Sequence, residues 1–173
     1  MSSYDASIPE GYPPLRTVLL LIDYQNVLVN MIQDPEKEQK LVDSAKTLLE
    51  TAREQKVATI HCTMDINLDP PPTNKVSGAC HTLHKPAFSG MPEIGAEYAE
   101  LAPAGTSAAT SGAVLGTATH ATDLDFVVTV VENACWDPNE QVHRTLIDTV
   151  IPTLAWVSSV DEAIARLTAS ASS

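Results

Sequence analysis

The sequence predicts an α/β protein of the Rossmann-like kind, in which a mainly parallel sheet forms the middle of a three-layer α/β/α fold. An all-apolar run at 18–22 is typical of a parallel strand that is buried on both faces. A capped helix is predicted at 34–55, and a β-rich run at 57–61 follows it directly. Strand, helix and strand in this order form a unit with a right-handed crossover and two parallel strands.

The first predicted helix has clear signals for its start and for its buried face. Asp34 is the expected N-cap, and Pro35 occupies the first helical position, where a backbone N–H has no partner within the helix. The pattern ends near 55–56. Its apolar residues recur three or four positions apart and predict one buried face: Leu41, Ala45, Leu48, Leu49 and Ala52.

The middle of the chain is less regular. Prolines between 62 and 103 exclude long elements, apart from a short helix predicted at 93–101, and long loops of this kind usually build a site. Small residues fill 104–121, which predicts a tight turn that leads into a closely packed helix at about 111–123.

The last third alternates again between strand and helix. A β-rich run at 126–131 predicts a core strand. Asp137 and Pro138 then predict the N-cap and the first residue of a helix. A final strand is predicted at 155–158, and the helix after it has a capping box at 159–162.

One domain is expected at 15–168, between an N-terminal arm at 1–14 and a disordered tail at 169–173. The chain has 173 residues, of which 44% are hydrophobic, which is enough for one core and too little for two. Prolines and polar residues in the first segment, and serines and alanines in the last, favour no regular element.

The charge balance excludes several classes of partner. Twenty-two acidic residues against ten basic ones give a net charge of -12, which disfavours binding to nucleic acids and to anionic membrane surfaces. No apolar stretch approaches the roughly 20 residues that span a bilayer, and 1–16 lacks a secretory signal pattern, so a cytoplasmic location is expected. Cys62, Cys80 and Cys135 are expected to be free thiols.

Asp23 is the main candidate for chemistry. It directly follows the apolar run and therefore lies at the mouth of a buried parallel strand, where α/β enzymes place their active sites. An aspartate at a strand end can also simply cap a turn. Gln25, two residues further on, is a candidate for contact with a substrate.

Two segments have a more specific pattern: LLLIDYQN at 19–26 and TSGAVLGTA at 110–118. They resemble the opening motif and the nucleophile segment of the isochorismatase-like hydrolases, also called the cysteine hydrolase superfamily. The similarity extends from about 15 to 167. It implies a three-layer fold and, usually, hydrolysis of a C–N bond in an amide, a carbamoyl compound or a related small molecule.

The resemblance also implies roles for single residues. Asp23 matches the family's acid/base aspartate, and Ser111 and Gly112 match the turn whose backbone N–H groups hold an oxyanion and contact the substrate. Where the family usually carries its nucleophilic cysteine, this chain has Ala113. Because a methyl group cannot attack a carbonyl, a covalent intermediate at this position is excluded.

The family's lysine can be placed in two ways. Lys85 is followed by an aromatic residue and a serine, as in the family's lysine motif. On a second alignment, 91–103 precedes the lysine, and then the lysine, a helix and the strand before the nucleophile turn are missing between Pro103 and Gly105. A central strand cannot be lost without exposing unpaired edges, so either another segment fills its place or the sequence omits it.

Other residues fit weaker alternatives. His61 ends the second predicted strand and is a candidate for substrate contact, although a core histidine is commoner. Cys135 follows a strand as a nucleophile would, but free cysteines are usually buried. Cys80, His81 and His84 have the spacing of metal ligands without a clear fourth, so neither a metal nor a cofactor is expected.

Three functions remain open. The first is a small-molecule hydrolase without the cysteine, in which Asp23, its pKa raised by burial, acts as general acid or base directly on substrate or water. The resemblance includes relatives that lack the cysteine and protonate a vinyl ether. The second is a C–N hydrolase made inactive by the alanine at 113, and the third is a non-catalytic binding protein. A homo-oligomer is expected in each case, with Trp136 and Trp156 as candidate core or interface residues.

Overall fold

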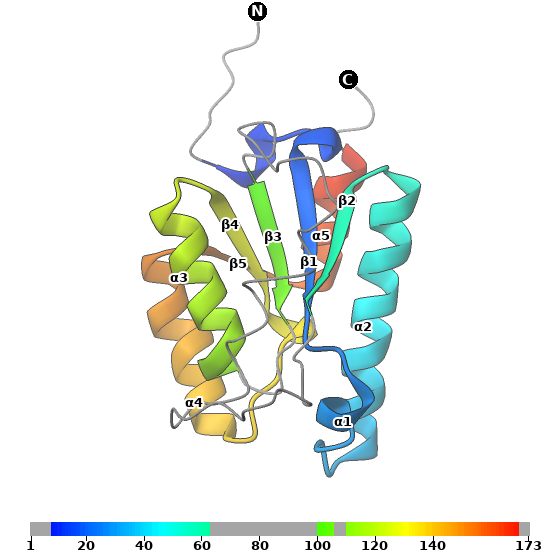
Figure 1. The fold of residues 1–173 in the computed structure, drawn as a ribbon, viewed down its shortest axis with the longest axis vertical. Helices are drawn as coiled ribbons and strands as arrows, with labels where there is room; N and C mark the ends of the chain where they lie inside the picture. Colours follow the sequence, from blue (N-terminus) through cyan, green and yellow to red (C-terminus); the bar gives the residue numbers. More distant parts are fainter. Residues whose placement is uncertain (1–7, 63–99, 106–109, 170–173) are drawn as a thin grey trace, which may run out of the picture.

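The structure, a computed structural model, describes residues 8–62, 100–105 and 110–169. Five parallel strands form one sheet in the order β2-β1-β3-β4-β5 (Figure 1). The strands are β1 (Thr17–Ile22), β2 (Ala58–Cys62), β3 (Glu100–Gly105), β4 (Val127–Val131) and β5 (Trp156–Ser158).

Helices cover both faces of this sheet. The α-helices are α1 (Asn26–Val29), α2 (Pro35–Glu54), α3 (Leu115–Asp123), α4 (Glu140–Thr145) and α5 (Val160–Ala169). α2 and α5 pack on one face, in a cluster that includes Leu19 and Leu21 of β1. α3 and the segment after α4 pack on the other face, against Val128 and Val130 of β4. The predicted three-layer α/β/α fold is confirmed.

β1 is buried along its whole length, as its apolar run predicts. All six of its residues are buried. Leu19 and Leu21 belong to the cluster beneath α2, whereas Val18, Leu20 and Ile22 belong to a cluster on the opposite face. A strand that is buried on both faces holds its two ends in fixed places, and the residue that comes after it is fixed with it.

The central strand β3 is the main departure from the sequence-based expectations. It pairs with β1 along its whole length, from Thr17 with Glu100 to Ile22 with Gly105. The predicted helix at 93–101 is therefore wrong for its last two residues, and 93–99 lie outside the described residues. β3 therefore occupies the central position in the sheet for which the second alignment, described above for the family's lysine, left no strand.

Pro103 explains why this strand was missed. Proline has no N–H to donate to a ladder and rarely occurs inside a central strand. Here the pairing of β3 with β4 covers only two positions and ends at Leu101, two residues before the proline. Beyond that point β3 pairs with β1 alone.

The described residues before β1 form two short turns. Two short 3-10 turns, Pro9–Gly11 and Pro14–Arg16, precede β1, and Pro9, Tyr12 and Pro14 are buried. Glu10 also forms an ion pair of 2.7 Å with Arg166 of α5. These residues lie at the amino end of the strands, opposite to the candidate site (Figure 1).

The starts of two later helices differ from the predictions. The helix predicted at 111–123 begins with a wider π-helical turn, Thr110–Val114, and continues as α3. The N-cap of α4 is Asn139 and not Asp137, because the Asn139 side chain accepts hydrogen bonds from the backbone N–H groups of Gln141 and Val142. No helix in the described part of the chain is both long and apolar enough to cross a membrane.

Candidate active site

Asp23 lies at the carboxyl end of β1 in a constrained conformation. It is 5% exposed, and its φ angle of 58° lies in the left-handed region. Its backbone N–H donates to the carbonyl oxygen of Cys62 at 2.7 Å, and its own carbonyl accepts from the N–H of Gln25 at 2.7 Å. Such a conformation costs about 1–3 kcal/mol for a residue other than glycine and is concentrated at functional sites.

Ala113 lies beside this strand end. It is 2% exposed and packs in one apolar cluster with Ile22, the residue before Asp23, and with Cys62 of β2. The π-helical turn that carries Ala113 therefore meets the ends of β1 and β2. The structure brings together the two segments that the family resemblance pairs.

Cys62 is a thiol next to Asp23 that the sequence analysis did not assign to the site. Burial, and after it the negative charge of Asp23, raise the pKa of Cys62 to about 11. A thiol with this pKa is protonated at neutral pH and is a poor nucleophile. The sequence signal that could have assigned Cys62 to the site is its position at the end of the second predicted strand, because the carboxyl ends of neighbouring parallel strands lie side by side.

Asp137 holds the start of the turn that carries Ala113. Its carboxylate is 4% exposed. One oxygen, Oδ2, accepts from the Ser111 backbone N–H at 3.0 Å and from the Ser111 hydroxyl at 2.8 Å. The other, Oδ1, accepts from the Asn139 N–H at 3.0 Å. The predicted N-cap of α4 is therefore a link between two segments.

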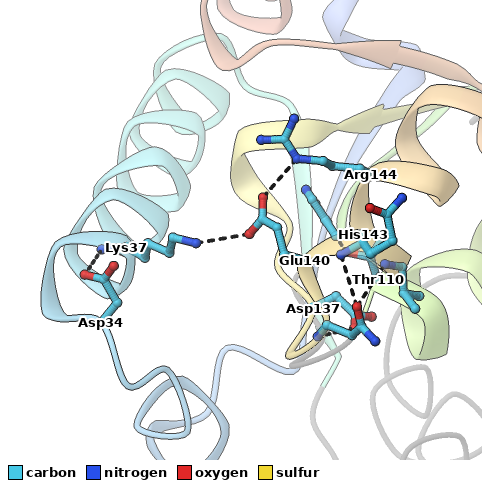
Figure 2. Close-up of polar contacts among 10 residues, drawn as sticks. Asp34, Lys37, Thr110, Asp137, Glu140, His143 and Arg144 are labelled. Carbon is cyan, nitrogen blue, oxygen red and sulfur yellow. Dashed lines mark hydrogen bonds and ion pairs between the residues drawn. The ribbon is translucent and has the colours of Figure 1, made fainter.

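Thr110, at the start of the same turn, makes a second link to the segment around Asp137, as Figure 2 shows. Its N–H donates to the Trp136 carbonyl oxygen at 2.8 Å. Its hydroxyl oxygen lies 3.0 Å from the same carbonyl oxygen and 2.8 Å from Nδ1 of His143. A carbonyl can only accept, so both contacts are satisfied when the hydroxyl donates to Trp136 and Nδ1–H of His143 donates to the hydroxyl.

The backbone N–H groups after Ser111 belong to the first turn of the helix. N–H groups at this position have no carbonyl partner earlier in the helix and can hold an anion. The Ser111 N–H is already bound by Asp137. An oxyanion at this turn would therefore face the N–H groups of Gly112 and Ala113.

The three remaining predicted site residues, Gln25, His61 and Lys85, have different outcomes. Gln25 is half-buried and bonded to Asp23 through its backbone, so it stays with the site. His61 is exposed and lies between Ile60 and Cys62, which both point toward Ala113, so its side chain points to the opposite face of the sheet. Lys85 lies outside the described residues.

Among the residues that the structure describes, neither a group of metal ligands nor Cys135, the alternative nucleophile, adds to this site. Cys80, His81 and His84 lie outside the described residues, and the described part of the chain has no group of three or more metal-ligating side chains that could hold an ion. Cys135 is buried, and burial, followed by the charge of Glu132, raises the pKa of its thiol well above the usual range. This thiol is also protonated at neutral pH.

A charged network lies on the surface near this region (Figure 2). Lys37 of α2 forms an ion pair of 3.0 Å with Glu140, the first residue of α4, and Arg144 contacts the same carboxylate at 3.2 Å. These bonds, that from Lys37 first, lower the pKa of Glu140. All three side chains are more than half exposed, so the network adds little stability.

Comparisons with known proteins agree with the observed fold. The family model of the isochorismatase domain matches residues 17–162. An isochorismatase family protein from Burkholderia thailandensis has a similar structure, with a TM-score of 0.66, 20% identity, and coverage of 91% of this chain and 97% of the other. A cysteine hydrolase from Pseudomonas syringae pv. phaseolicola gives a TM-score of 0.70, 16% identity, and coverage of 98% and 100%.

A third similar structure is the YcaC gene product of Escherichia coli, described as an octameric hydrolase of unknown specificity. Its TM-score is 0.63 and its identity 18%, with coverage of 91% of this chain and 82% of the other. Identities this low show the fold and not the reaction. Curated protein sequences give no match to this chain.

Proposed function

Because this chain belongs to the isochorismatase family, we propose that it is a small-molecule hydrolase in which Asp23 is the general acid or base and residue 113 takes no covalent part. The observation that carries this proposal is Asp23 itself. A buried carboxylate is held in a left-handed conformation at the end of β1, a strand buried along its whole length, next to the position of the family nucleophile.

The proposed reaction needs a proton donor and a water molecule. Asp23 in its protonated form would give a proton to the substrate, water would add to the cationic carbon that results, and the carboxylate would regain a proton from that water. Burial favours the protonated form of a carboxyl group, which a general acid requires near neutral pH.

A second candidate is a C–N hydrolase that the alanine at position 113 has made inactive. Ala113 favours it, because this small side chain occupies a buried place in the first turn of the helix while Asp23 remains beside it. The substitution A113C distinguishes the two candidates. Amide or carbamoyl hydrolysis that appears only in A113C supports the second candidate.

The test of the leading proposal compares Asp23→Asn with a matched control. Asp125 is also an aspartate with positive φ, at 63°, but it is exposed and precedes β4 at the amino end of the sheet. On a panel of vinyl ethers, amides and carbamoyl compounds, D23N should lose at least about 100-fold in kcat, as expected for a general acid or base. D125N should keep the rate of the parent protein. Equal turnover by D23N and the parent protein would contradict the proposal, whereas no turnover of any substrate by the parent protein would favour a binding protein.

We also propose that the protein forms a homo-oligomer around a small-molecule site. Trp156 is 45% exposed on β5, at one edge of the described sheet, and an exposed edge strand tends to be covered in a stable protein. The Escherichia coli relative is described as an octamer. Native mass spectrometry measures the state directly, and a monomer at micromolar concentration would contradict this proposal.

A further inference from the structure

Asp137 has more hydrogen bonds than a helix cap needs. It lies 26 positions after Ser111, yet it accepts both the backbone N–H and the hydroxyl of this residue. It also accepts the N–H of Asn139, immediately before α4. A buried carboxylate is stable only when its oxygens are bonded, and these three donors meet that need.

A carboxylate, and not an amide, is required by this geometry. Both oxygens of Asp137 accept hydrogen bonds, Oδ2 from Ser111 and Oδ1 from Asn139. An asparagine has only one accepting oxygen, so its NH₂ group would face a donor on one side. The N-cap Asp34 differs, because a single oxygen, Oδ1, accepts from both Glu36 and Lys37.

The bond to Ser111 constrains the next residues of the turn. Ser111 is the second residue of the π-helical turn, and Ala113 comes two residues later. The carboxylate removes the Ser111 N–H from the set that a ligand could use and fixes where the next two N–H groups lie. Ala113 in turn belongs to the same apolar cluster as Ile22, which precedes Asp23, and Cys62, whose carbonyl oxygen accepts from the Asp23 N–H.

We infer that Asp137 is a positioning residue: its buried carboxylate fixes Ser111 and thereby sets the place of residue 113 and its N–H group relative to Asp23. This inference rests on the proposed function, since it concerns the same site. It assigns to Asp137 a role in geometry and no contact with substrate.

The test uses a thiol introduced by A113C as a probe of that geometry. In the full chain, the rate of alkylation by iodoacetamide is measured against pH, with peptide mass spectrometry to separate position 113 from the natural cysteines. N–H groups at a helix start stabilise a thiolate and lower the pKa of its thiol. A113C alone, and with D137N, D34N, S111A or D23N, gives five profiles.

D137N should raise the inflection of the profile by about one pH unit, which is about a tenfold loss of rate below the inflection. The loss of the Asp137 charge by itself would lower the inflection, so a rise reports the geometry. D34N should leave the profile unchanged, because its bonds can be kept by an asparagine. An unchanged or lowered inflection in folded D137N would overturn the inference.

Two further variants keep the test decisive. S111A removes one of the three bonds to Asp137 from an exposed side chain and should raise the inflection by less than D137N does. If D137N fails to fold, an unchanged profile in S111A overturns the inference. D23N should lower the inflection, because it removes a negative charge beside the thiol. The proposed function fails separately, when D23N keeps the turnover of the parent protein, whatever D137N does to the alkylation profile.

Discussion

The same dipeptide, aspartate followed by proline, occurs at 34–35 and at 137–138 with different structural roles. Asp34 is 2–3 residues from both of its partners, Glu36 and Lys37, and caps α2 as a local signal should. Asp137 is buried and uses one oxygen to bind Ser111, which is 26 positions away. The comparison teaches that this motif predicts an N-cap when the aspartate is exposed. A buried aspartate can instead accept hydrogen bonds from a residue that is distant in the sequence.

The largest expected difference between the two regions is in stability. Asp137→Ala should lower the free energy of unfolding by about 3 kcal/mol, because three hydrogen bonds to a buried, charged acceptor are lost together. Asp34→Ala should lower it by about 1 kcal/mol, the usual value for an exposed N-cap. Urea unfolding measures both. Equal losses would mean that Asp137 is an ordinary cap.

Thr110 sharpens the comparison, since it makes a second link between the two segments that Asp137 joins. Thr110→Val keeps the shape of the side chain but removes the hydroxyl that contacts Trp136 and His143. It should lower the free energy of unfolding by about 2 kcal/mol, because Nδ1–H of His143 loses its acceptor. A change close to zero in thermal unfolding would show that water replaces the hydroxyl.

Asn139 tests which residue caps α4. Its side chain accepts from the N–H groups of Gln141 and Val142, as Asp34 does for α2. Asn139→Ala should therefore lower the free energy of unfolding by about 1 kcal/mol, the same loss as Asp34→Ala. A neutral Asn139→Ala in urea unfolding would return the capping role to Asp137.

The smallest effect concerns the ion pair that joins the two helix starts, Lys37 with Glu140. The Lys37 bond lowers the pKa of Glu140 in the folded protein, so this contact stabilises above the unfolded pKa of about 4.5 and is lost as pH falls through the folded value. Lys37→Met should lower Tm slightly at neutral pH and low salt.

That difference in Tm should vanish in acid and at about 0.5 M salt, because protonation removes the charge of Glu140 and salt screens exposed pairs. Lys40→Met is a suitable control, since Lys40 lies on the exposed side of the same helix. A Tm difference between Lys37→Met and the parent protein that persists at high salt would contradict this interpretation.

The sequence predicted the elements whose signals are local. The apolar run of β1, the N-cap at Asp34 and the capping box at 159–162 all depend on residues within a few positions, and the structure confirms each of them. The capping box, for example, is formed by Ser159 and Glu162, which bond each other's backbone N–H groups.

The sequence could not predict features that depend on distant partners. β3 has proline and small residues with little strand preference, and its place between β1 and β4 supplies what its own residues do not. The bond between Ser111 and Asp137, and that between Thr110 and His143, join segments that no local pattern relates. Asp23 was found because a strand end is a local signal, whereas Cys62 required the pairing of two strands.

One pair of variants tests most directly whether Asp23, and not residue 113, carries the reaction. Turnover of a responding vinyl ether or carbamoyl substrate should fall at least about 100-fold in Asp23→Asn. It should change only a few-fold in Ala113→Gly, which removes the methyl group and leaves the backbone N–H in place. A large loss in Ala113→Gly with an active Asp23→Asn would contradict the proposed role of Asp23 and move the chemistry to the turn.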